Sequence, residues 1–418
     1  MPKLSAIPAC PATPTPTPRH GFIKKEYTIT LITPMCGGGV QTNHVDATHP
    51  FRETSIRGQL QFWWRATRGA PCPETNDLKI AHQKIWGATD HASKIKVWVS
   101  GPPPSLAPME LARYGDPRLY ALFPVLIGDG GRDRRTIRTE IAATGKFTLN
   151  LQYPSDLAED VDAALRAWIN FGGLGMRTRR GCGALYCPEL SAKNVDAVQG
   201  LAQGLGTGGP AHLWPTLPKS ILCGAPAAPD AAWKNVIQLL QTFRQGEDVG
   251  RNPGRDGRAG RSRWPEPETI RRITNRRAAS HPRLEDIPDD AFPRAEFGLP
   301  IIFHFKDDGE PRDTTLYPVA NNMEVDRMAS PLVLKPLAIS ESTAVPIVLR
   351  LNTPQLEQVR LCEREKVLDT AGNEQIRNPE LAKYKKSPLA YSDTGSALDA
   401  FIAFCIKKWH PVTAPGRK

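Results

Sequence analysis

One segment restricts the fold more than any other: a helical pattern that leads directly into a loop of glycines and arginines. Residues 156–170, DLAEDVDAALRAWIN, predict an amphipathic helix. Its apolar face is formed by Leu157, Val161, Leu165 and Trp168. The loop FGGLGMRTRRGCG follows at 171–183, and ALYC at 184–187 predicts a short closing strand. The chain therefore has to return from helix to strand through main chain that carries few side chains.

This loop does not fit the common nucleotide-binding motifs. It follows a helix rather than a strand, so it is no dinucleotide fingerprint, and it has no GK[ST] of a Walker A loop. Glycines do let a phosphate backbone approach main-chain amides, and a helix-to-strand turn needs only one or two of them. Three nearby arginines suit an RNA backbone. We therefore interpret these as RNA-binding residues: Gly173, Gly175, Arg177, Arg179 and Arg180.

The first half of the chain predicts a ferredoxin-like βαββαβ arrangement, as in RNA-recognition modules. EYTITLIT (26–33) alternates like a strand, Pro34 ends it, and another loop of glycines follows at Gly37, Gly38 and Gly39. Further strands are predicted at 94–100 and 146–153, and a helix at 55–68. The segment between the second and third strands contains GPPPS and GGRDRRTIR, which indicates an insertion.

The second half allows another ferredoxin-like domain. A helix is predicted at 230–244, strands at 299–305, 331–337 and 345–351, and a last helix at about 396–408. Residues 245–262 are rich in Gly and Arg, which predicts a mobile loop. We expect an α+β protein with a disordered Pro-rich tail at 1–22, an N-terminal domain at 23–200 and a C-terminal domain at 201–418.

The positive charge is concentrated in arginine-rich segments. The net charge is +11, and residues 52–68, 177–180 and 244–277 together account for all of it. Arginine binds phosphate in a bidentate manner and stacks on aromatic planes. This distribution indicates a polyanionic partner, although a generally solvated surface remains open. It adds these RNA-binding candidates: Arg52, Arg258, Arg261, Arg263 and Trp264.

The stretch FRETSIRGQLQFWWRATR (51–68) interleaves tryptophan with arginine. On a helical wheel Trp63 falls on the apolar side, while Trp64 borders a stripe formed by Arg57, Arg65 and Arg68. We therefore predict that Trp63 is a core residue and that Trp64 stacks on a base, together with the stripe arginines. The alternative is that both tryptophans are buried and the arginines are merely solvated.

The composition argues against secreted, membrane and zinc-binding classes. No apolar run reaches the ~20 residues needed to cross a bilayer, and the N-terminal MPKLSAIPACPATPTPTPRH has no signal-peptide core. The eight cysteines include no CxxC pair. We expect a cytoplasmic protein with reduced thiols, no cofactor and no membrane partner.

Several motifs together resemble one family, the RAMP proteins of CRISPR systems. They are TPMCGGG (33–39), TSIRGQLQFWWRA (54–66), KIWGA (84–88) and WINFGGLGMRTRRGCGAL (168–185). The segments GRSRWPEPETIRR (260–272), FPRAEFGLPIIFHF (292–305) and RMASPLVLKPL (327–337) are most similar to the first-numbered subunit of the type III-B Cmr effector complex. Cys36, Gln61 and Met176 depart from the pattern we expect for that subunit.

The resemblance implies a non-catalytic subunit of an antiviral ribonucleoprotein. It implies two ferredoxin-like folds, contact with crRNA and single-stranded target RNA near the crRNA 3′ end, and other Cmr RAMP subunits as partners. Cleavage and nucleotide cyclisation are implied for other subunits.

Two other functions stay open. Some RAMP proteins are metal-independent RNases that process crRNA with a histidine as general acid or base. His44 and His49 are the candidates, and with Asp46 they could also form a metal site. His304 lies in an apolar strand pattern, so we expect it in the core. The third class is a scaffold that contacts only proteins, against which the basic segments argue.

Overall fold

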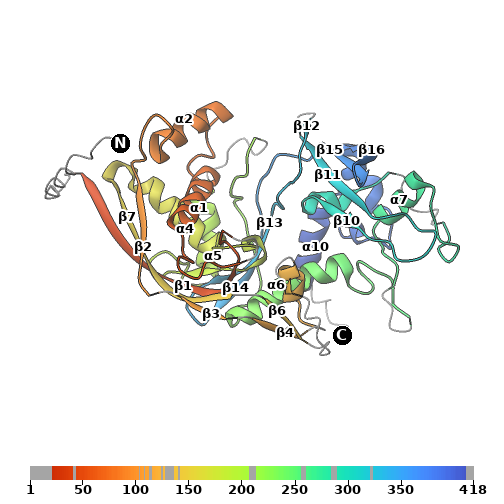
Figure 1. The fold of residues 1–418 in the computed structure, drawn as a ribbon, viewed down its shortest axis with the longest axis horizontal. Helices are drawn as coiled ribbons and strands as arrows, with labels where there is room; N and C mark the ends of the chain where they lie inside the picture. Colours follow the sequence, from red (N-terminus) through yellow and green to blue (C-terminus); the bar gives the residue numbers. More distant parts are fainter. Residues whose placement is uncertain are drawn as a thin grey trace, which may run out of the picture.

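The computed structural model of the chain describes residues 21–40, 44–102, 104–107, 109–112, 115–123, 126–127, 136–139, 142–206, 213–255, 260–283, 290–320 and 323–410. Within these residues, helices are combined with antiparallel sheets, which confirms the expected α+β class (Figure 1). The predicted tail lies outside the described residues up to residue 20. None of the described helices is long and apolar enough to cross a membrane.

The first half builds one sheet whose strands alternate with helices. Its elements are β1 (Phe22–Cys36), α1 (Glu53–Ala66), α2 (Thr75–Trp86), β2 (Lys96–Ser100), β7 (Ala142–Pro154), α4 (Ala158–Phe171) and β8 (Leu185–Tyr186). The strand order is β2-β7-β1-β8 with antiparallel neighbours, and β3 (Ser105–Ala107) also pairs with β7. The predicted elements of this half are confirmed, while the sequence pattern gives no prediction of α2.

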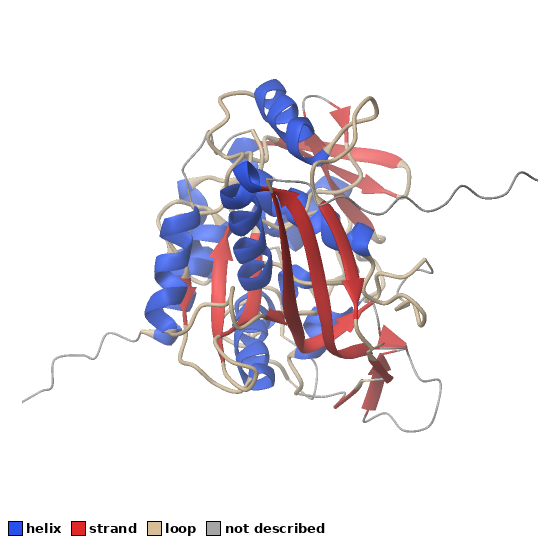
Figure 2. Ribbon diagram, turned by 90° about the vertical axis from the view of Figure 1, so that its left-hand side faces the viewer, coloured by secondary structure: helices blue, strands red, loops and turns tan. Residues whose placement is uncertain are grey.

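Alternate residues of β1 are buried, which shows which face of this sheet points into the core. Tyr27, Ile29 and Leu31 of β1 all point into one core, as the alternating pattern predicts. Helices α1 and α4 lie side by side over that face of the sheet (Figures 1 and 2). Trp63 and Trp168 are buried there, at 3% and 0% exposure. The start of the glycine loop at residues 171–183 is therefore positioned by α4, which packs on the sheet.

The predicted insertion between β2 and β7 is confirmed. Besides β3, it contains β4 (Glu110–Ala112), α3 (Arg118–Leu122), β5 (Leu126–Ile127) and β6 (Thr136–Thr139). The last three strands form a small sheet in the order β4-β6-β5. Most of GGRDRRTIR lies outside the described residues.

The second half contributes a sheet that packs against the first half. Its elements are α5 (Val195–Leu205), β9 (Leu222–Cys223), α6 (Pro229–Gln245), β13 (Leu332–Ala338), β14 (Ala344–Arg350) and α10 (Ala397–Trp409), and its strand order is β13-β14-β9. Every residue of β13 is buried. Val333 and Leu337 join the core of the first half, whereas Leu332 and Leu334 pack with α6 and α10.

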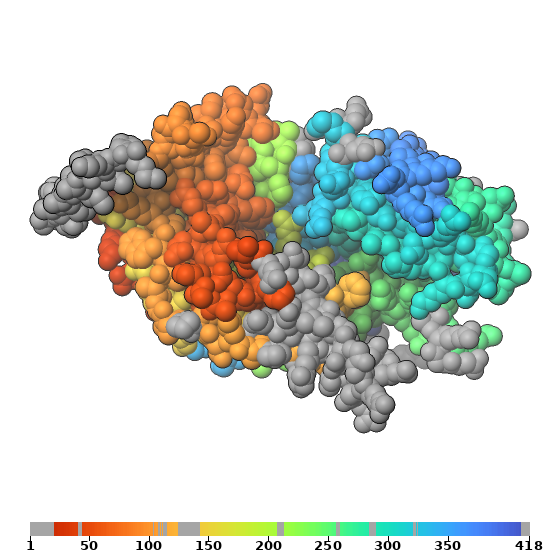
Figure 3. All heavy atoms as spheres, viewed as in Figure 1, coloured from red at the N-terminus to blue at the C-terminus, as the bar shows by residue number. Residues whose placement is uncertain are grey.

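A third sheet lies at the opposite end of the molecule from β1 (Figures 1 and 3). It comprises β10 (Ile301–Phe303), β11 (Thr314–Ala320), β12 (Met323–Glu324), β15 (Gln358–Glu363) and β16 (Lys366–Gly372), accompanied by the short helices α7 (Glu266–Thr274), α8 (Asn373–Ile376) and α9 (Pro379–Ala382). Its core includes Ile270, Phe303 and Leu316. The prediction that His304 is a core residue is wrong: its side chain is 65% exposed beside Asp313, because it follows the end of β10.

The packing of the glycine loop at residues 171–183 gives a direct test of this fold. Gly183 has a φ of +60°, and a Cβ on it would lie 2.0 Å from the Leu174 carbonyl oxygen. We expect Gly183→Ala to lower the free energy of unfolding by about 2 kcal/mol or more, because strain and a main-chain clash add together.

Gly200→Ala is the matched control for this substitution. Gly200 lies within α5, where an added Cβ meets open space, so this variant should gain about 0.5–1 kcal/mol. Urea unfolding measures both values. Equal midpoints for the two variants would contradict the packing described here.

Candidate nucleic-acid interface

The two glycine loops lie against each other at the end of β1. The first glycine loop comprises residues 37–39 and the second comprises 171–183. The Met176 amide donates to the Cys36 carbonyl at 2.7 Å, and the Gly183 amide donates to the Pro34 carbonyl at 2.9 Å. The Thr33 hydroxyl donates to the Gly181 carbonyl at 2.6 Å. These bonds continue the pairing of β1 beyond β8 and form one surface from the two loops.

Close packing accounts for most of the loop glycines. A Cβ on Gly173 would lie 2.7 Å from the Gly183 oxygen, and one on Gly181 would lie 2.6 Å from the Trp233 ring. Gly38 and Gly175 face each other, with 3.2 Å between an added Cβ and the opposite Cα. The number of glycines is therefore explained without a ligand. Gly38 and Gly175 remain solvent-exposed, so main chain is presented at the surface.

The three arginines of the second loop bind carbonyl groups. Arg177, at a φ of +57°, donates from Nε to the Ala121 carbonyl at 2.6 Å. Arg179 donates to the Ser330 carbonyl and also lies over the Phe62 ring, 5.6 Å from its centroid. Arg180 donates to the Leu332 carbonyl at 2.7 Å. All three are partly buried at the junction with β13, so only part of each guanidinium is available to a ligand.

These arginines form a cluster with Arg244 of α6. Among the described residues, no carboxylate lies within 4 Å of the charged nitrogens of Arg177, Arg179, Arg180 or Arg244. Burial lowers the pKa of Arg180 to about 9, with repulsion from Arg177 adding to the effect. The Nε of Arg244 is buried without a hydrogen-bond partner in the described part of the chain. The cluster therefore carries uncompensated positive charge.

The arginines of α1 have diverse contacts. Arg52 donates from Nη1 to the Gly38 carbonyl at 3.2 Å and so reaches the first glycine loop. Arg57 donates to the carbonyls of Ile95 and Trp86. Arg65 Nη1 lies 3.3 Å from His82 Nε2. Burial, together with repulsion from Arg65 and Arg57, lowers the pKa of His82 to about 4.

Arg68 differs from these three because it pairs with acids, at 3.3 Å from Glu159 and 3.8 Å from Asp160. Of the four arginines around α1, Arg52 is therefore the one that the structure brings to the glycine loops.

The prediction that Trp64 stacks on a base is wrong for this structure. Trp64 is 3% exposed, and its Nε1 donates to Asp160 at 2.7 Å. Its ring packs edge-on against His82 of α2. The wheel leaves Trp64 at a border because the pattern does not reveal α2, which covers that side of α1. The assignment of Trp63 to the core is confirmed.

The third basic segment is also turned inward in part. Trp264 is 1% exposed, and its Nε1 donates to the Arg244 carbonyl at 3.0 Å, so it offers no stacking surface. Arg263 binds Asp248 at 3.0 Å and Asn252 at 2.8 Å. Arg261 is partly buried, and Arg258 lies outside the described residues. The prediction that Trp264 contacts RNA is therefore corrected: the ring packs with Phe243 and Phe297.

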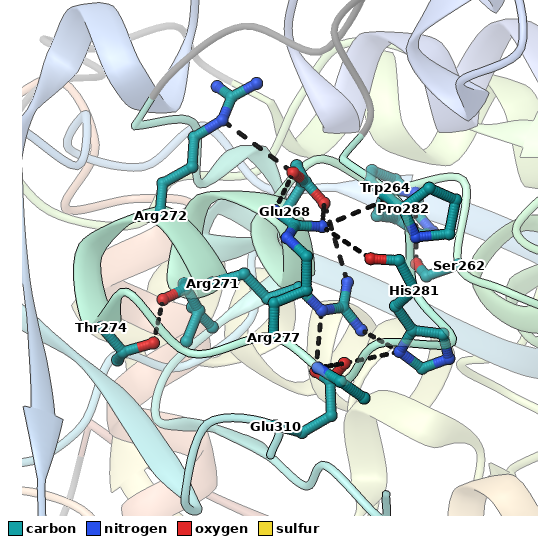
Figure 4. A network of polar contacts seen from close by, with 12 residues as sticks. Ser262, Trp264, Glu268, Arg271, Arg272, Thr274, Arg277, His281, Pro282 and Glu310 are labelled. Carbon is teal, nitrogen blue, oxygen red and sulfur yellow. Dashed lines mark hydrogen bonds and ion pairs between the residues drawn. The ribbon is translucent and has the colours of Figure 1, made fainter.

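A network of buried ion pairs holds arginines within and just after α7 (Figure 4). Glu268 is 1% exposed and accepts from Arg277, with one of the two bonds at 3.0 Å. Glu310 accepts from Arg271 at 2.7 Å and pairs with His281 at 2.5 Å. No local sequence pattern identifies this network, because Glu310 lies far along the chain from Arg271 and His281. Arg271 and Arg277 of the segment 244–277 are therefore paired with acids inside the fold.

The histidines beside the first glycine loop belong to a turn. Asp46 accepts from the amides of Thr48 and His49, both at 2.9 Å, and these bonds lower its pKa to about 2. His49 Nδ1 lies 3.1 Å from the Thr48 hydroxyl. Within the described residues, no group of three His, Cys, Asp or Glu side chains is placed to hold a metal ion. The role of Asp46 seen here is to cap the turn.

Comparison with known proteins agrees with the sequence motifs. Residues 28–186 match the family model of the RAMP superfamily.

Two proteins of Pyrococcus furiosus are similar. The CRISPR system Cmr subunit Cmr1-1 is 29% identical over 150 residues, which are 35% of this chain and 43% of that protein. Subunit Cmr1-2 is 29% identical over 187 residues, which are 39% of this chain and 95% of that protein. The match thus spans less than half of the first relative. The resemblance to RAMP proteins is confirmed.

Solved structures give weaker likeness. The crystal structure of Cmr1 from Pyrococcus furiosus in the apo form has a TM-score of 0.42 at 15% identity, covering 86% of this chain and 96% of that one. A chain of the cryo-EM structure of the Type III-B Cmr-beta bound to cognate target RNA has a TM-score of 0.45 at 10% identity, covering 79% and 94%. Both TM-scores are below 0.5, and the fold described above rests on the strand order.

The burial of Trp64 leads to a stability prediction. Trp64→Ala should lower the free energy of unfolding by ~3–5 kcal/mol, as Trp63→Ala should, because each leaves a large cavity. Trp64→Phe should cost about 1–3 kcal/mol, since Asp160 loses a buried donor. Trp98→Ala, on the partly exposed face of β2, is the control and should cost less than either alanine variant. Chemical unfolding measures all four, and an unchanged midpoint for Trp64→Ala would restore the stacking interpretation.

Proposed function

We propose that this chain, whose residues 28–186 match the family model of the RAMP superfamily, is a non-catalytic RNA-binding subunit of a type III-B Cmr ribonucleoprotein. It acts in the cytoplasm in antiviral defence. Its RNA ligands are crRNA and single-stranded target RNA, contacted near the crRNA 3′ end, and its protein partners are other Cmr RAMP subunits. The similar proteins named as Cmr subunits support this assignment.

One observation carries the RNA-binding part of the proposal. Arg177, Arg179, Arg180 and Arg244 form a cluster at the two glycine loops, where Gly38 and Gly175 are exposed, and no described carboxylate pairs with these arginines. Carbonyl oxygens satisfy guanidinium hydrogen bonds but leave the charge in place. A polyphosphate backbone supplies the missing negative charge and accepts hydrogen bonds from main-chain amides.

The topology supports two ferredoxin-like units. In the first half, β1-α1-β2-β7-α4-β8 with strand order β2-β7-β1-β8 is the antiparallel order expected of βαββαβ. In the second half, β9-α6-β13-β14-α10 repeats this order without the fourth strand. We propose these as the domains at 23–200 and 201–418, with the third sheet inserted into the second one.

Among the sites named from sequence, we retain those that the structure brings to the loops. They are Arg52, Gly37, Gly38, Gly39, Gly173, Gly175, Arg177, Arg179 and Arg180. Arg57, Arg65 and Arg261 are kept as candidates outside the loops, whereas Arg68 and Arg263 pair with acids. Arg258 lies outside the described residues. No observation favours the alternative of a crRNA-processing endoribonuclease.

RNA binding should be electrostatic and should depend on the loop arginines. We expect log affinity for single-stranded RNA to fall linearly with log salt, with a slope of about −0.7 per phosphate neutralised. The double variant Arg52→Gln/Arg177→Gln should bind more weakly and with a shallower slope. Arg312→Gln is the control, because Arg312 is 66% exposed beside Glu363 in the third sheet. Fluorescence anisotropy at several salt concentrations decides: a salt-insensitive affinity sinks the proposal.

The isolated chain should not cleave RNA. We expect repeat-containing and target RNAs to remain intact with and without Mg²⁺ or Mn²⁺, because His49 is engaged in the capped turn. Denaturing gels of labelled RNA provide the measurement. Specific cleavage that is lost in His44→Ala or His49→Ala would establish the endoribonuclease instead.

A further inference from the structure

The second half of the chain holds both ends of the second glycine loop. Lys335 Nζ donates to the Gly172 carbonyl at the start of the loop, at 2.7 Å. Near the other end, Arg180 donates to the Leu332 carbonyl and, from Nη2, to the Ser330 hydroxyl at 2.9 Å. We call residues 330–335 the clamp segment. Because Gly172 follows directly after α4, this segment fixes the point where helix becomes loop.

Lys335 is placed where a lysine is rarely found. It is 0% exposed and lies within β13, paired with Ile347 of β14. An ammonium group has three N–H donors, and the bond to Gly172 is the one that the described residues provide. A buried lysine held by a single carbonyl serves no core-packing purpose that Leu or Met would not serve better.

The surroundings of Lys335 supply no counter-charge. The charged side chains on the elements packed against β13 are Arg179 and Arg180 in the loop, Glu159, Asp160, Asp162 and Arg166 on α4, Asp230, Lys234 and Arg244 on α6, and Arg350 on β14. Burial alone lowers the pKa of Lys335, to about 7. The amine therefore changes charge near neutral pH without direct influence from a neighbouring acid.

We propose that Lys335 is a positioning residue: it fixes the start of the second glycine loop through the clamp segment, and taking up a proton loosens that hold. The function of the loop rests on the proposed RNA binding, but the hold itself does not. When β13 separates from the loop, Lys335 enters water and regains an ordinary lysine's affinity for protons.

The direction of the pH effect follows from linkage. Between pH 10.5 and 7 the opened form binds a proton that the closed form lacks, so the closed form is progressively destabilised as the pH falls. Below pH 7 both forms are protonated and the effect levels off. For these two pKa values, the opening equilibrium should rise about tenfold between pH 8 and pH 6.

Hydrogen exchange without RNA tests the hold directly. The reporters are the amides of Leu174, Met176 and Gly183, of which the first bonds within the second glycine loop and the other two bond to the end of β1. After correction for intrinsic rates, their protection should fall about tenfold from pH 8 to pH 6. Leu316 and Leu361, paired between β11 and β15, are the internal reference and should not follow. If reporters and reference change together, Lys335 affects only global stability and the proposal is overturned.

Two variants separate the hydrogen bond from the charge. Lys335→Gln keeps a donor without a titratable group, so loop protection should stay high and become independent of pH. Lys335→Met removes the donor, so protection should be low at both pH values. The unchanged wild-type pH profile in both variants would overturn the proposal. If Lys335→Met does not fold, Lys335→Gln and the wild-type profile still decide.

A binding titration links the hold to RNA. With a labelled single-stranded RNA of mixed sequence, Lys335→Met should weaken binding several-fold at an unchanged salt slope, because a buried amine meets no phosphate. Lys366→Met, which removes an exposed lysine at the start of β16, should leave affinity unchanged. A slope shallower by about 0.7 would mean that Lys335 contacts phosphate and is not a positioning residue. If the wild-type chain binds no RNA, the proposed function is refuted. The hydrogen-exchange result still tests whether Lys335 fixes the start of the second glycine loop.

Discussion

The structure depends on one strand that is buried from both sides. All seven residues of β13 are inaccessible to solvent, with Val333 facing the core of the first half and Leu334 facing α6 and α10. A strand that buries apolar side chains on both faces is stable only when both faces are covered. The two halves of the chain therefore share a strand, and neither core is complete alone. Everything near β13 is positioned by both halves.

The second glycine loop is the clearest case of this dependence. Gly173, Gly175 and Gly183 pack on main chain of the first half, whereas Gly181 packs on the ring of Trp233 in α6. The Trp233 Nε1 also donates to the Arg180 carbonyl at 2.7 Å. Trp168 of α4 donates to the Gly173 carbonyl at 3.2 Å. Five of the thirteen residues of this loop are glycines, so these bonds to other elements help to set its shape. The glycines permit the close approach, and the tryptophans fix it.

The sequence predicts the parts of the fold that are governed by periodicity. The alternation in 26–33 and the helical stripe in 156–170 reappear as β1 and α4 because each element buries one face. Predictions for single side chains do less well. Trp64 and Trp264 are both buried because elements distant in the sequence, α2 and the Phe243 region, cover them. No local pattern contains that information, and Glu310 is missed for the same reason.

Counting charge from sequence overstates the basic surface, and the structure shows how. Arginines that bind acids, such as Arg68 and Arg277, are neutralised within the fold. Arginines that bind carbonyls, such as Arg177 and Arg180, are satisfied in hydrogen bonding but keep their charge. In water-poor surroundings that charge has a long reach. Among the described residues, the second glycine loop therefore holds a cluster of arginines that no carboxylate pairs with, although residues 244–277 hold more arginines. The type of partner, more than the number of arginines, decides where a polyanion is attracted.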